Sequence, residues 1–349
     1  MNSARLRLRL AAAVAVAAAG LTLTAPASAT PFTPAPATVE TTAPVWKGLY
    51  QTAYSERNDV LWATASTGRP PVTQTALLKL DPDTLEVLDT FTPPVVDATT
   101  GAREAVYGVD VDDENNTVWV TNTRDNGVAV YSQRTGKHLA SLPNVGHARE
   151  VVVDEKRDLA WATSYNSGEV VAFDTDTFEE KKRIAVEGAG FMGLALDENT
   201  GKVYASDLNN PRIAQFSPYK DEIVKFHPAG AGAISVSLSR NGRTAYTTNQ
   251  TDGTVSVVNL NTSTVTATIP TGAGALSVAT DERTGKLVVA NRVAATVSVV
   301  DPRTGAVQDL PTQKNPNHVT VVDGTAYVLD KSGAGADGFD LGYRIDLGH

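Results

Sequence analysis

The stretch AISVSLSRNGRTAYTTNQTDGTVSVVNLNTSTVTATIPTG, residues 233–272, holds the repeating unit of this chain. From residue 234 to residue 238, apolar residues alternate with serines, which is the period of a half-buried β-strand. The dipeptides Asn-Gly at 241–242 and Asp-Gly at 252–253 favour tight hairpin turns, because these residues tolerate a positive φ. We therefore predict four short antiparallel strands, at 234–238, 244–248, 254–258 and 265–269.

This unit recurs along the chain with a period close to forty residues. One bulky residue marks the second strand of each unit, and successive markers are 42, 43, 42, 42 and 39 residues apart: Trp119, Trp161, Tyr204, Tyr246, Val288 and Tyr327. Trp62 belongs to the same series but precedes Trp119 by 57 residues, which makes seven units. Four strands in a repeat of about forty residues are typical of a β-propeller blade. We expect the markers to pack between neighbouring blades.

The two ends of the chain predict how the ring of blades closes. Residues 38–43 align with the fourth strand of a blade, whereas the last repeat stops at its third strand, at 343–347. We therefore expect the N-terminal strand to complete the C-terminal blade, which leaves no exposed inner edge. The predicted fold class is all-β: a seven-bladed β-propeller of four-stranded blades, forming a single domain over residues 38–349.

The longer first repeat carries two insertions. Comparison with the sixth repeat places six extra residues within 66–75, between the second and third strands, and the remainder within 93–106, after the fourth strand. Both connections fall on one face of the predicted ring, and so does the Gly-rich segment 331–339 of the last repeat. Because loops on a rigid scaffold concentrate binding residues, this loop-rich face is the candidate binding face.

The segments 245–249 (AYTTN) and 254–258 (TVSVV) resemble the repeats of the YVTN-repeat propellers, the YncE-like family. The segment 118–122 (VWVTN) repeats the pattern, and the resemblance extends over roughly residues 38–349. It implies a seven-bladed, often extracytoplasmic propeller, and it implies no defined catalytic residue because the shared motifs belong to the scaffold. Three blades depart from the Thr-Asn pair, at Tyr165-Asn166, Leu208-Asn209 and Leu329-Asp330.

The N-terminus has the features of a secretory signal peptide. Arginines at positions 5, 7 and 9 precede an apolar run over 10–23, and Ala27-Ser28-Ala29 provides a cleavage site. We expect residues 1–29 to be removed, residues 30–37 to form a flexible leader, and the cysteine-free protein to be secreted. No later segment approaches the roughly 20 apolar residues of a membrane helix. Loss of three arginines takes the formal net charge from −9 to −12, which disfavours nucleic-acid binding.

The residues that begin the innermost strands differ in polarity around the ring. Blades 4 to 6 have apolar residues there and the contiguous blades 7, 1, 2 and 3 have polar ones: Met192, Ile234 and Leu276 against His318, Tyr50, Tyr107 and Arg149. Innermost strands begin near the axis of a propeller, so we predict a ligand site at the channel mouth, formed by these polar residues and their neighbours: Tyr50, Arg103, Glu104, Tyr107, His147, Arg149, Glu150, Asn317 and His318. Its arginine would bind an anionic group.

The same residues also have structural interpretations, which the sequence leaves open. Arg149 and Glu150 form, in this alternative, an internal ion pair that fixes neighbouring blades. The five histidines show no metal-binding spacing, and we expect neither a metal nor a cofactor. Three acids of the last repeat are potential calcium ligands, although their spacing fits no established calcium loop: Asp330, Asp337 and Asp340.

The leading functional expectation is an exported, non-catalytic binding or interaction module without a catalytic residue. Its partner would be a small polar ligand or another exported protein on the loop-rich face, and we expect a monomer. The second expectation is a lactonase-type hydrolase, by analogy with propellers that have a polar axial pocket, for which Glu150, His147 and His318 are available. Nucleic-acid binding is a third alternative, and the acidic charge of the chain disfavours it.

Overall fold

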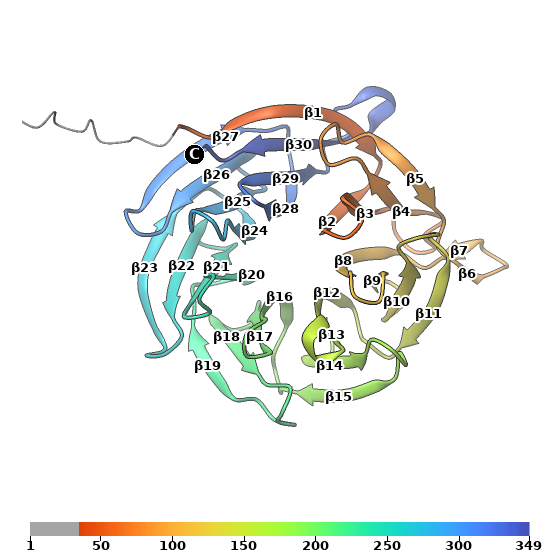
Figure 1. The fold of residues 1–349 in the computed structure, drawn as a ribbon, viewed down its shortest axis with the longest axis horizontal. Helices are drawn as coiled ribbons and strands as arrows, with labels where there is room; N and C mark the ends of the chain where they lie inside the picture. The colour runs from red at the N-terminus through yellow and green to blue at the C-terminus, as the bar shows by residue number, and fades with distance from the viewer. Residues whose placement is uncertain (1–34, 349) are drawn as a thin grey trace, which may run out of the picture. The chain divides into compact units, whose positions relative to one another are not determined.

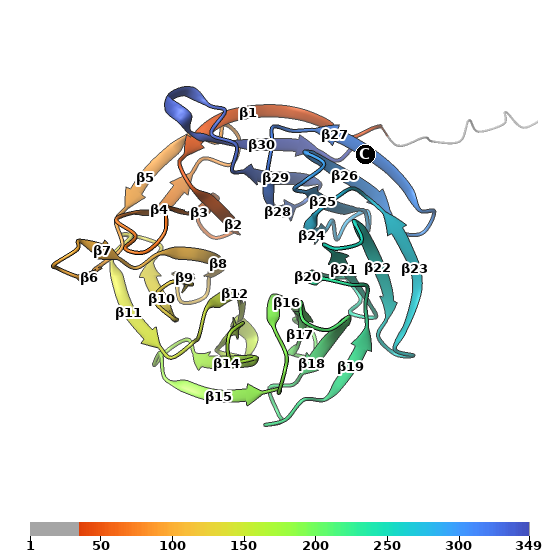
Figure 2. The ribbon, with the colours of Figure 1, turned by 180° about the vertical axis from the view of Figure 1, so that it is seen from behind.

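The computed structural model describes residues 35–348 and shows seven four-stranded antiparallel sheets arranged around a central channel (Figures 1 and 2). The predicted fold class, an all-β seven-bladed propeller, is therefore confirmed. The predicted signal peptide (1–29) and most of the predicted leader (30–37) lie outside the described residues. Within residues 35–348 there is no helix with the length and apolar composition that a membrane span requires.

Each blade runs from an innermost strand at the channel to an outermost strand at the periphery. Blade 1 contains β2 (Leu49–Ser55), β3 (Val60–Thr67), β4 (Gln74–Leu80) and β5 (Val87–Phe91). Blade 2 contains β8 (Val106–Asp112), β9 (Thr117–Asn122), β10 (Gly127–Ser132) and β11 (His138–Pro143). Blade 3 contains β12 (Ala148–Asp154), β13 (Leu159–Ser164), β14 (Glu169–Asp174) and β15 (Glu180–Ala185).

The remaining blades repeat this order. Blade 4 contains β16 (Phe191–Asp197), β17 (Lys202–Asp207), β18 (Arg212–Phe216) and β19 (Lys225–Pro228). Blade 5 has the four strands predicted from residues 233–272: β20 (Ala233–Leu238), β21 (Thr244–Asn249), β22 (Thr254–Asn259) and β23 (Thr264–Pro270). Blade 6 contains β24 (Ala275–Thr280), β25 (Leu287–Asn291), β26 (Thr296–Asp301) and β27 (Ala306–Pro311). Blade 7 contains β28 (Pro316–Val322), β29 (Thr325–Asp330), β30 (Asp340–Asp346) and β1 (Thr38–Trp46).

Strand β1 is the outermost strand of blade 7, although it comes from the opposite end of the chain (Figure 1). It pairs antiparallel with β30, from Thr38 opposite Asp346 to Trp46 opposite Asp340. Just before β1, the side-chain amide of Gln308 in blade 6 bonds both the N–H and the carbonyl of residue 37, at 2.9 and 2.8 Å. The start of the described chain is thus bonded to the last two blades.

The core of the fold is distributed among the interfaces between blades. Each innermost strand contacts the innermost strand of the next blade, and β28 contacts β2 in the same way. Seven apolar clusters in residues 35–348 each lie between two neighbouring blades. As predicted, the marker residues pack at these interfaces, and Trp62, Trp119 and Trp161 are fully buried. The position of each blade therefore depends on both of its neighbours.

The two insertions of blade 1 contact each other. The backbone N–H of Arg103 in the second insertion donates to the carbonyl of Val72 in the first, at 2.8 Å. The second insertion contains a small hairpin that the sequence did not predict, β6 (Val95–Asp97) and β7 (Ala102–Arg103). Two short 3-10 turns complete the described chain, η1 (Glu155–Arg157) after β12 and η2 (Ala336–Gly338) before β30.

Candidate functional site

A β-bulge near the start of every innermost strand shapes the wall of the channel. In each blade the register with the second strand shifts at this point, so that the innermost strand carries one extra residue. Consecutive residues of one strand can then both contribute to the wall, and Arg149 and Glu150 of β12 do so. The bulges explain why strict alternation of side chains fails to describe this part of the fold.

The first bulge residue of each strand forms a layer at the channel mouth: Tyr50, Tyr107, Arg149, Met192, Ile234, Leu276 and Asn317. In blade 7 the predicted register is wrong by one residue. Pro316 pairs with Asp330 in blade 7 as Ala275 pairs with Asn291 in blade 6, so Pro316 and Ala275 occupy equivalent positions. Asn317 therefore takes the position predicted for His318, and the contrast between a polar and an apolar side of the mouth remains.

His318 lies one layer deeper and links two blades. Its Nδ1 accepts a hydrogen bond from the backbone N–H of Thr52 in the next blade, at 3.3 Å. Burial lowers the pKa of His318 to about 3, so the ring is neutral. Three side chains at the same depth accept the equivalent bond from their next blade at 3.2–3.3 Å: Gln51 from Val109, Ser235 from Val278 and Ser277 from Val319. His318 thus has the same structural role as two serines and a glutamine.

A cavity of about 210 Å³ lies at the polar side of the channel mouth, and we call it the mouth cavity. Its walls come from the connections predicted on the loop-rich face, including the first insertion of blade 1 and the connection between blades 1 and 2. Tyr50 and Tyr107 line it together with four cationic side chains and no carboxylate: Arg124, Arg149, Arg292 and Lys331. The mouth cavity is therefore strongly cationic.

Two tyrosines and two of these cations form one continuous row. The ring centroids of Tyr50 and Tyr107 are 4.2 Å apart. The Lys331 ammonium lies 3.5 Å from the centroid of the Tyr50 ring, and the Arg149 guanidinium lies 4.1 Å from that of Tyr107. Arg149 also donates from Nη2 to the Tyr107 hydroxyl at 2.5 Å. Cation–π contacts of this kind hold the two charges in place without neutralising them.

None of the four cations forms an ion pair with a carboxylate of residues 35–348. The Arg149–Glu150 ion pair that the sequence left open is thus not formed, and Glu150 accepts a hydrogen bond from Gln51 Nε2 at 2.8 Å instead. The Nε of Arg149 is buried and has no hydrogen-bond partner in the described structure. A buried donor without a partner is costly, so an anion bound beside Arg149 would be stabilised by an unused donor.

Lys331 and Arg292 extend the cationic wall from blades 7 and 6. The Nζ of Lys331 donates to the carbonyl of Leu49 at 2.9 Å, and Nη1 of Arg292 donates to Oδ1 of Asn317 at 3.1 Å. Burial lowers the pKa of Lys331 to about 8, with Asp340 opposing the shift and Arg292 adding to it. The lysine is therefore charged at neutral pH and loses its charge under mildly alkaline conditions.

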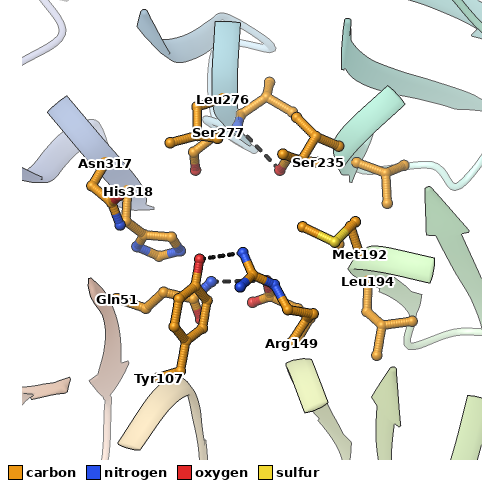
Figure 3. A pocket seen from close by; sticks show the side chains of 15 residues that line it. Gln51, Tyr107, Arg149, Met192, Leu194, Ser235, Leu276, Ser277, Asn317 and His318 are labelled. Carbon is orange, nitrogen blue, oxygen red and sulfur yellow. Dashed lines mark hydrogen bonds between the residues drawn. The ribbon is translucent and has the colours of Figure 1, made fainter. Parts of the chain in front are cut away.

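A second cavity of about 120 Å³ occupies the channel itself, and we call it the channel cavity (Figure 3). Tyr107 and Arg149 line both cavities, and Figure 3 shows Leu276 across the lumen from them. Burial raises the pKa of Glu150 on this wall to about 7, with the hydrogen bond from Gln51 and the charge of Arg149 opposing the shift. At neutral pH a large fraction of the molecules therefore has a protonated Glu150.

The opposite end of the channel has the reverse charge. A cavity of about 570 Å³ there is lined by one arginine, by His318 and by seven carboxylates: Glu56, Asp110, Glu150, Glu198, Asp281, Glu282 and Asp323. Burial raises the pKa of Asp110 to about 7. The channel thus connects a cationic mouth on the loop-rich face to an acidic mouth on the other face.

Three predicted site residues do not line the mouth cavity or the channel cavity. Arg103 donates from Nη1 to the carbonyl of Pro93 at 2.8 Å, within the second insertion of blade 1. Glu104 is buried and accepts a hydrogen bond from the Ser141 hydroxyl at 2.5 Å. His147 lies on a turn, with its ring 5.7 Å from that of a neighbouring tyrosine. Because their contacts lie away from both cavities, we do not include these three residues in the candidate site.

Two of the acids considered as calcium ligands accept hydrogen bonds from backbone N–H groups. Asp330 accepts from the N–H of Leu341 at 2.8 Å, and Asp340 accepts from the N–H of Gly48 at 2.7 Å. Asp337 lies in η2 with a φ of 57°. In the part of the chain that the structure describes, no group of three or more His, Cys, Asp or Glu side chains is arranged to hold a metal ion.

Comparison with known proteins relates this fold to a family, although no family model matches the chain. The uncharacterized protein YncE of Escherichia coli strain K12 is 28% identical over 180 residues, and that of Salmonella typhi is 26% identical over 176 residues. The matches cover 48% and 47% of this chain, and the chain spans about half the length of these curated relatives. The seven blades agree with this likeness. The chain is a YncE-like propeller.

Two solved structures share the fold of this YncE-like propeller. Virginiamycin B lyase from Staphylococcus aureus is similar with a TM-score of 0.70 and 11% identity, over 89% of this chain and 99% of that one. Hydrazine synthase from Kuenenia stuttgartiensis is similar with a TM-score of 0.71 and 13% identity, over 82% and 93%. At these identities the likeness shows the fold alone, because one fold supports many functions.

Three of the four cations in the mouth cavity of this YncE-like propeller were not predicted from the sequence: Arg124, Arg292 and Lys331. Arg292 and Lys331 directly follow the second strands of consecutive blades, β25 and β29, and Arg124 lies two residues after β9. A signal for two of them was present, because adjacent repeats have a cation at the same repeat position. The convergence of all four around one cavity depends on the closed ring.

Replacing Glu150 by Gln is expected to change how stability depends on pH. Folding raises the pKa of Glu150 from 4.5 to about 7, so the folded protein keeps a proton that the unfolded chain releases between these values. The free energy of unfolding of the wild type therefore falls as pH rises through this window, and Glu150→Gln removes this contribution. We expect the variant to gain about 2–4 °C in Tm over the wild type at pH 8 and little at pH 4, measured by calorimetry. Glu222→Gln, at an exposed position, is the control and should gain nothing at either pH.

Proposed function

We propose that this YncE-like propeller is an exported, non-catalytic binding module that takes up a small anionic ligand in the mouth cavity. The observation that supports this most directly is the charge of the cavity: four cations and no carboxylate, in a protein of formal net charge −9. Clustered like charges repel one another, and an anion relieves this repulsion. Two or three arginine side chains with fixed positions suit the oxygens of a phosphate, sulfate or carboxylate.

Export is supported by the N-terminal sequence. The arginines before the apolar run and the Ala-Ser-Ala site favour cleavage after residue 29. A mature N-terminus at Thr30, found by mass spectrometry of protein recovered from the culture medium, is the expected result. Protein that stays in the cytoplasm with residues 1–29 attached would contradict export and leave the binding proposal untouched.

Isothermal titration with sulfate, inorganic phosphate and citrate tests the binding proposal. We expect saturable binding of one anion per chain, weakened by added sodium chloride because the attraction is electrostatic. Glycerol and glucose serve as neutral controls and should not bind. No saturable heat with any of the three anions would contradict the proposal.

A lactonase-type hydrolase is the second candidate function, and one observation favours it. Glu150 lies on the channel wall with a pKa of about 7, which suits a general acid or base at neutral pH. Lactone hydrolysis that is lost in Glu150→Gln and is sensitive to a chelator would replace the non-catalytic proposal. Binding of a single-stranded oligonucleotide that declines steeply with salt would indicate nucleic-acid binding instead.

Because the pKa of Lys331 is lowered, anion binding is expected to weaken as the solution becomes alkaline. Its pKa of about 8 means that its charge is present below this pH and lost above it, while the three arginines stay charged. Sulfate keeps a constant charge in this range, so its affinity should fall between about pH 7 and about pH 9. The fall should disappear in Lys331→Met and shift to higher pH in Lys331→Arg. An unchanged pH profile in Lys331→Met would show that another group is responsible.

A further inference from the structure

The wall of the channel cavity has two chemically different sides. Tyr107, Arg149 and Asn317 lie on one side, and blades 4 to 6 form the other side, where apolar side chains lie beside Ser235 and Ser277. The apolar side chains of the channel cavity come from β16, β20 and β24: Met192, Leu194, Ile234, Val236, Leu276 and Val278. Figure 3 shows Met192 and Leu276 directed at the same open lumen as Arg149. An apolar side of this kind has no function in binding an inorganic anion.

The two cavities adjoin at two shared side chains, those of Tyr107 and Arg149. Tyr107 and Arg149 line the mouth cavity with one part of their surface and the channel cavity with another. An anion held by Arg149, Arg292 and Lys331 in the mouth cavity would therefore lie next to the channel cavity. Small-molecule sites usually combine apolar walls with a few polar groups that fix orientation.

We infer that the ligand is an amphipathic organic anion, with a phosphate or carboxylate head in the mouth cavity and a short apolar chain in the channel cavity. This inference rests on the proposed function, because it uses the same cations for the head. The chain would lie against Met192, Ile234 and Leu276 and displace water from their surfaces. The small volume of the channel cavity, about 120 Å³, limits the apolar chain to a few carbon atoms.

A series of n-alkyl phosphates, from methyl to hexyl phosphate, tests this inference with the full chain. We expect affinity to rise about fourfold for each added methylene until the channel cavity is filled, and then to level off. The neutral alcohols of the same chain lengths should bind far more weakly, because they lack the head. An affinity that stays flat or falls with chain length would overturn the inference, and unchanged binding of inorganic phosphate would leave the proposed function intact.

Two variants test whether the alkyl chain of the ligand lies in the channel cavity. Ile234→Ser and Leu276→Ser should reduce the gain per methylene while leaving the affinity for inorganic phosphate within about twofold of wild type. Val307→Ser, at a partly exposed position on the outermost strand β27, is the matched control and should leave both unchanged. Retained phosphate binding shows that a variant is folded. If the gain in affinity per methylene is identical in all three variants, the alkyl chain binds elsewhere and the inference is overturned. Loss of binding to every phosphate in the wild type would overturn the proposed function as well.

Discussion

Deletion of residues 35–46 is expected to abolish stable folding, with a loss of more than about 5 kcal/mol in the free energy of unfolding. The deletion removes strand β1, whose ladder with β30 contributes hydrogen bonds worth about 1 kcal/mol each. It also removes Val45 and Ala37, two buried residues of the apolar clusters on either side of blade 7. The exposed edge of β30 would then be available for pairing between molecules, so we expect aggregation as well. Thermal unfolding and light scattering measure these effects.

Deletion of residues 1–34 alone is the control, because it keeps β1, and it should leave Tm unchanged. A milder variant, Gln308→Ala, removes the amide that bonds the backbone of Ala37 and should lower Tm by about 2–4 °C. A synthetic peptide of residues 35–47 should restore soluble, cooperatively unfolding protein when added to the truncated chain. Truncated protein that is monomeric and melts at the wild-type temperature would show that β1 is dispensable for the ring.

Arg149→Ala is expected to reduce the affinity for sulfate by about 30-fold or more. Removing a buried charge that binds an anion costs about 2–5 kcal/mol, and Arg149 is the cation shared by both cavities. Its guanidinium already has one fixed partner, the Tyr107 hydroxyl, and an unused Nε donor. Arg149→Lys should restore part of the affinity, because it keeps the charge and loses the planar geometry. Isothermal titration measures both changes.

Stability separates a binding role of Arg149 from a structural one. Arg149 has no ion pair in the described residues, so Arg149→Ala should lower Tm by only a few degrees. Arg303→Ala is the matched control, since this exposed arginine pairs only with Asp301 and should affect neither affinity nor Tm. A large fall in Tm with unchanged sulfate affinity would assign Arg149 to the scaffold.

The blades could be predicted from the sequence because their signals are local. Alternation of side chains and the turn dipeptides of residues 233–272 are sufficient to predict four strands, and they were found where expected. The number of repeats then gives the number of blades, because a marker such as Trp161 occurs once in each repeat. The polar side of the mouth followed from aligning the same repeats, and Tyr50, Tyr107 and Arg149 lie together as predicted.

The site itself depended on features that a repeat alignment does not contain. The bulges place consecutive residues on one wall, which no strict alternation predicts. The outermost strand of blade 6 also lacks the bulge found in that of blade 5, so the repeat is one residue shorter before blade 7 and His318 lies outside the mouth layer. The grouping of Lys331 with Arg124 requires the ring to bring blade 7 beside blade 1, which in turn lies beside blade 2. Conversely, Arg103 and Glu104 are close to Tyr107 in sequence, but the side chain of Arg103 bonds within its own insertion and that of Glu104 bonds strand β11.

The opposed charges of the two channel mouths have a consequence for the route of a ligand. An anion that enters on the loop-rich face meets the carboxylates around Asp110 and Glu198 if it moves further along the axis. Repulsion by these carboxylates rises as the anion leaves the arginines, so passage through the ring is unfavourable. A bound anion of the proposed kind would therefore leave through the cationic mouth by which it entered, and it would not cross the ring to the acidic mouth.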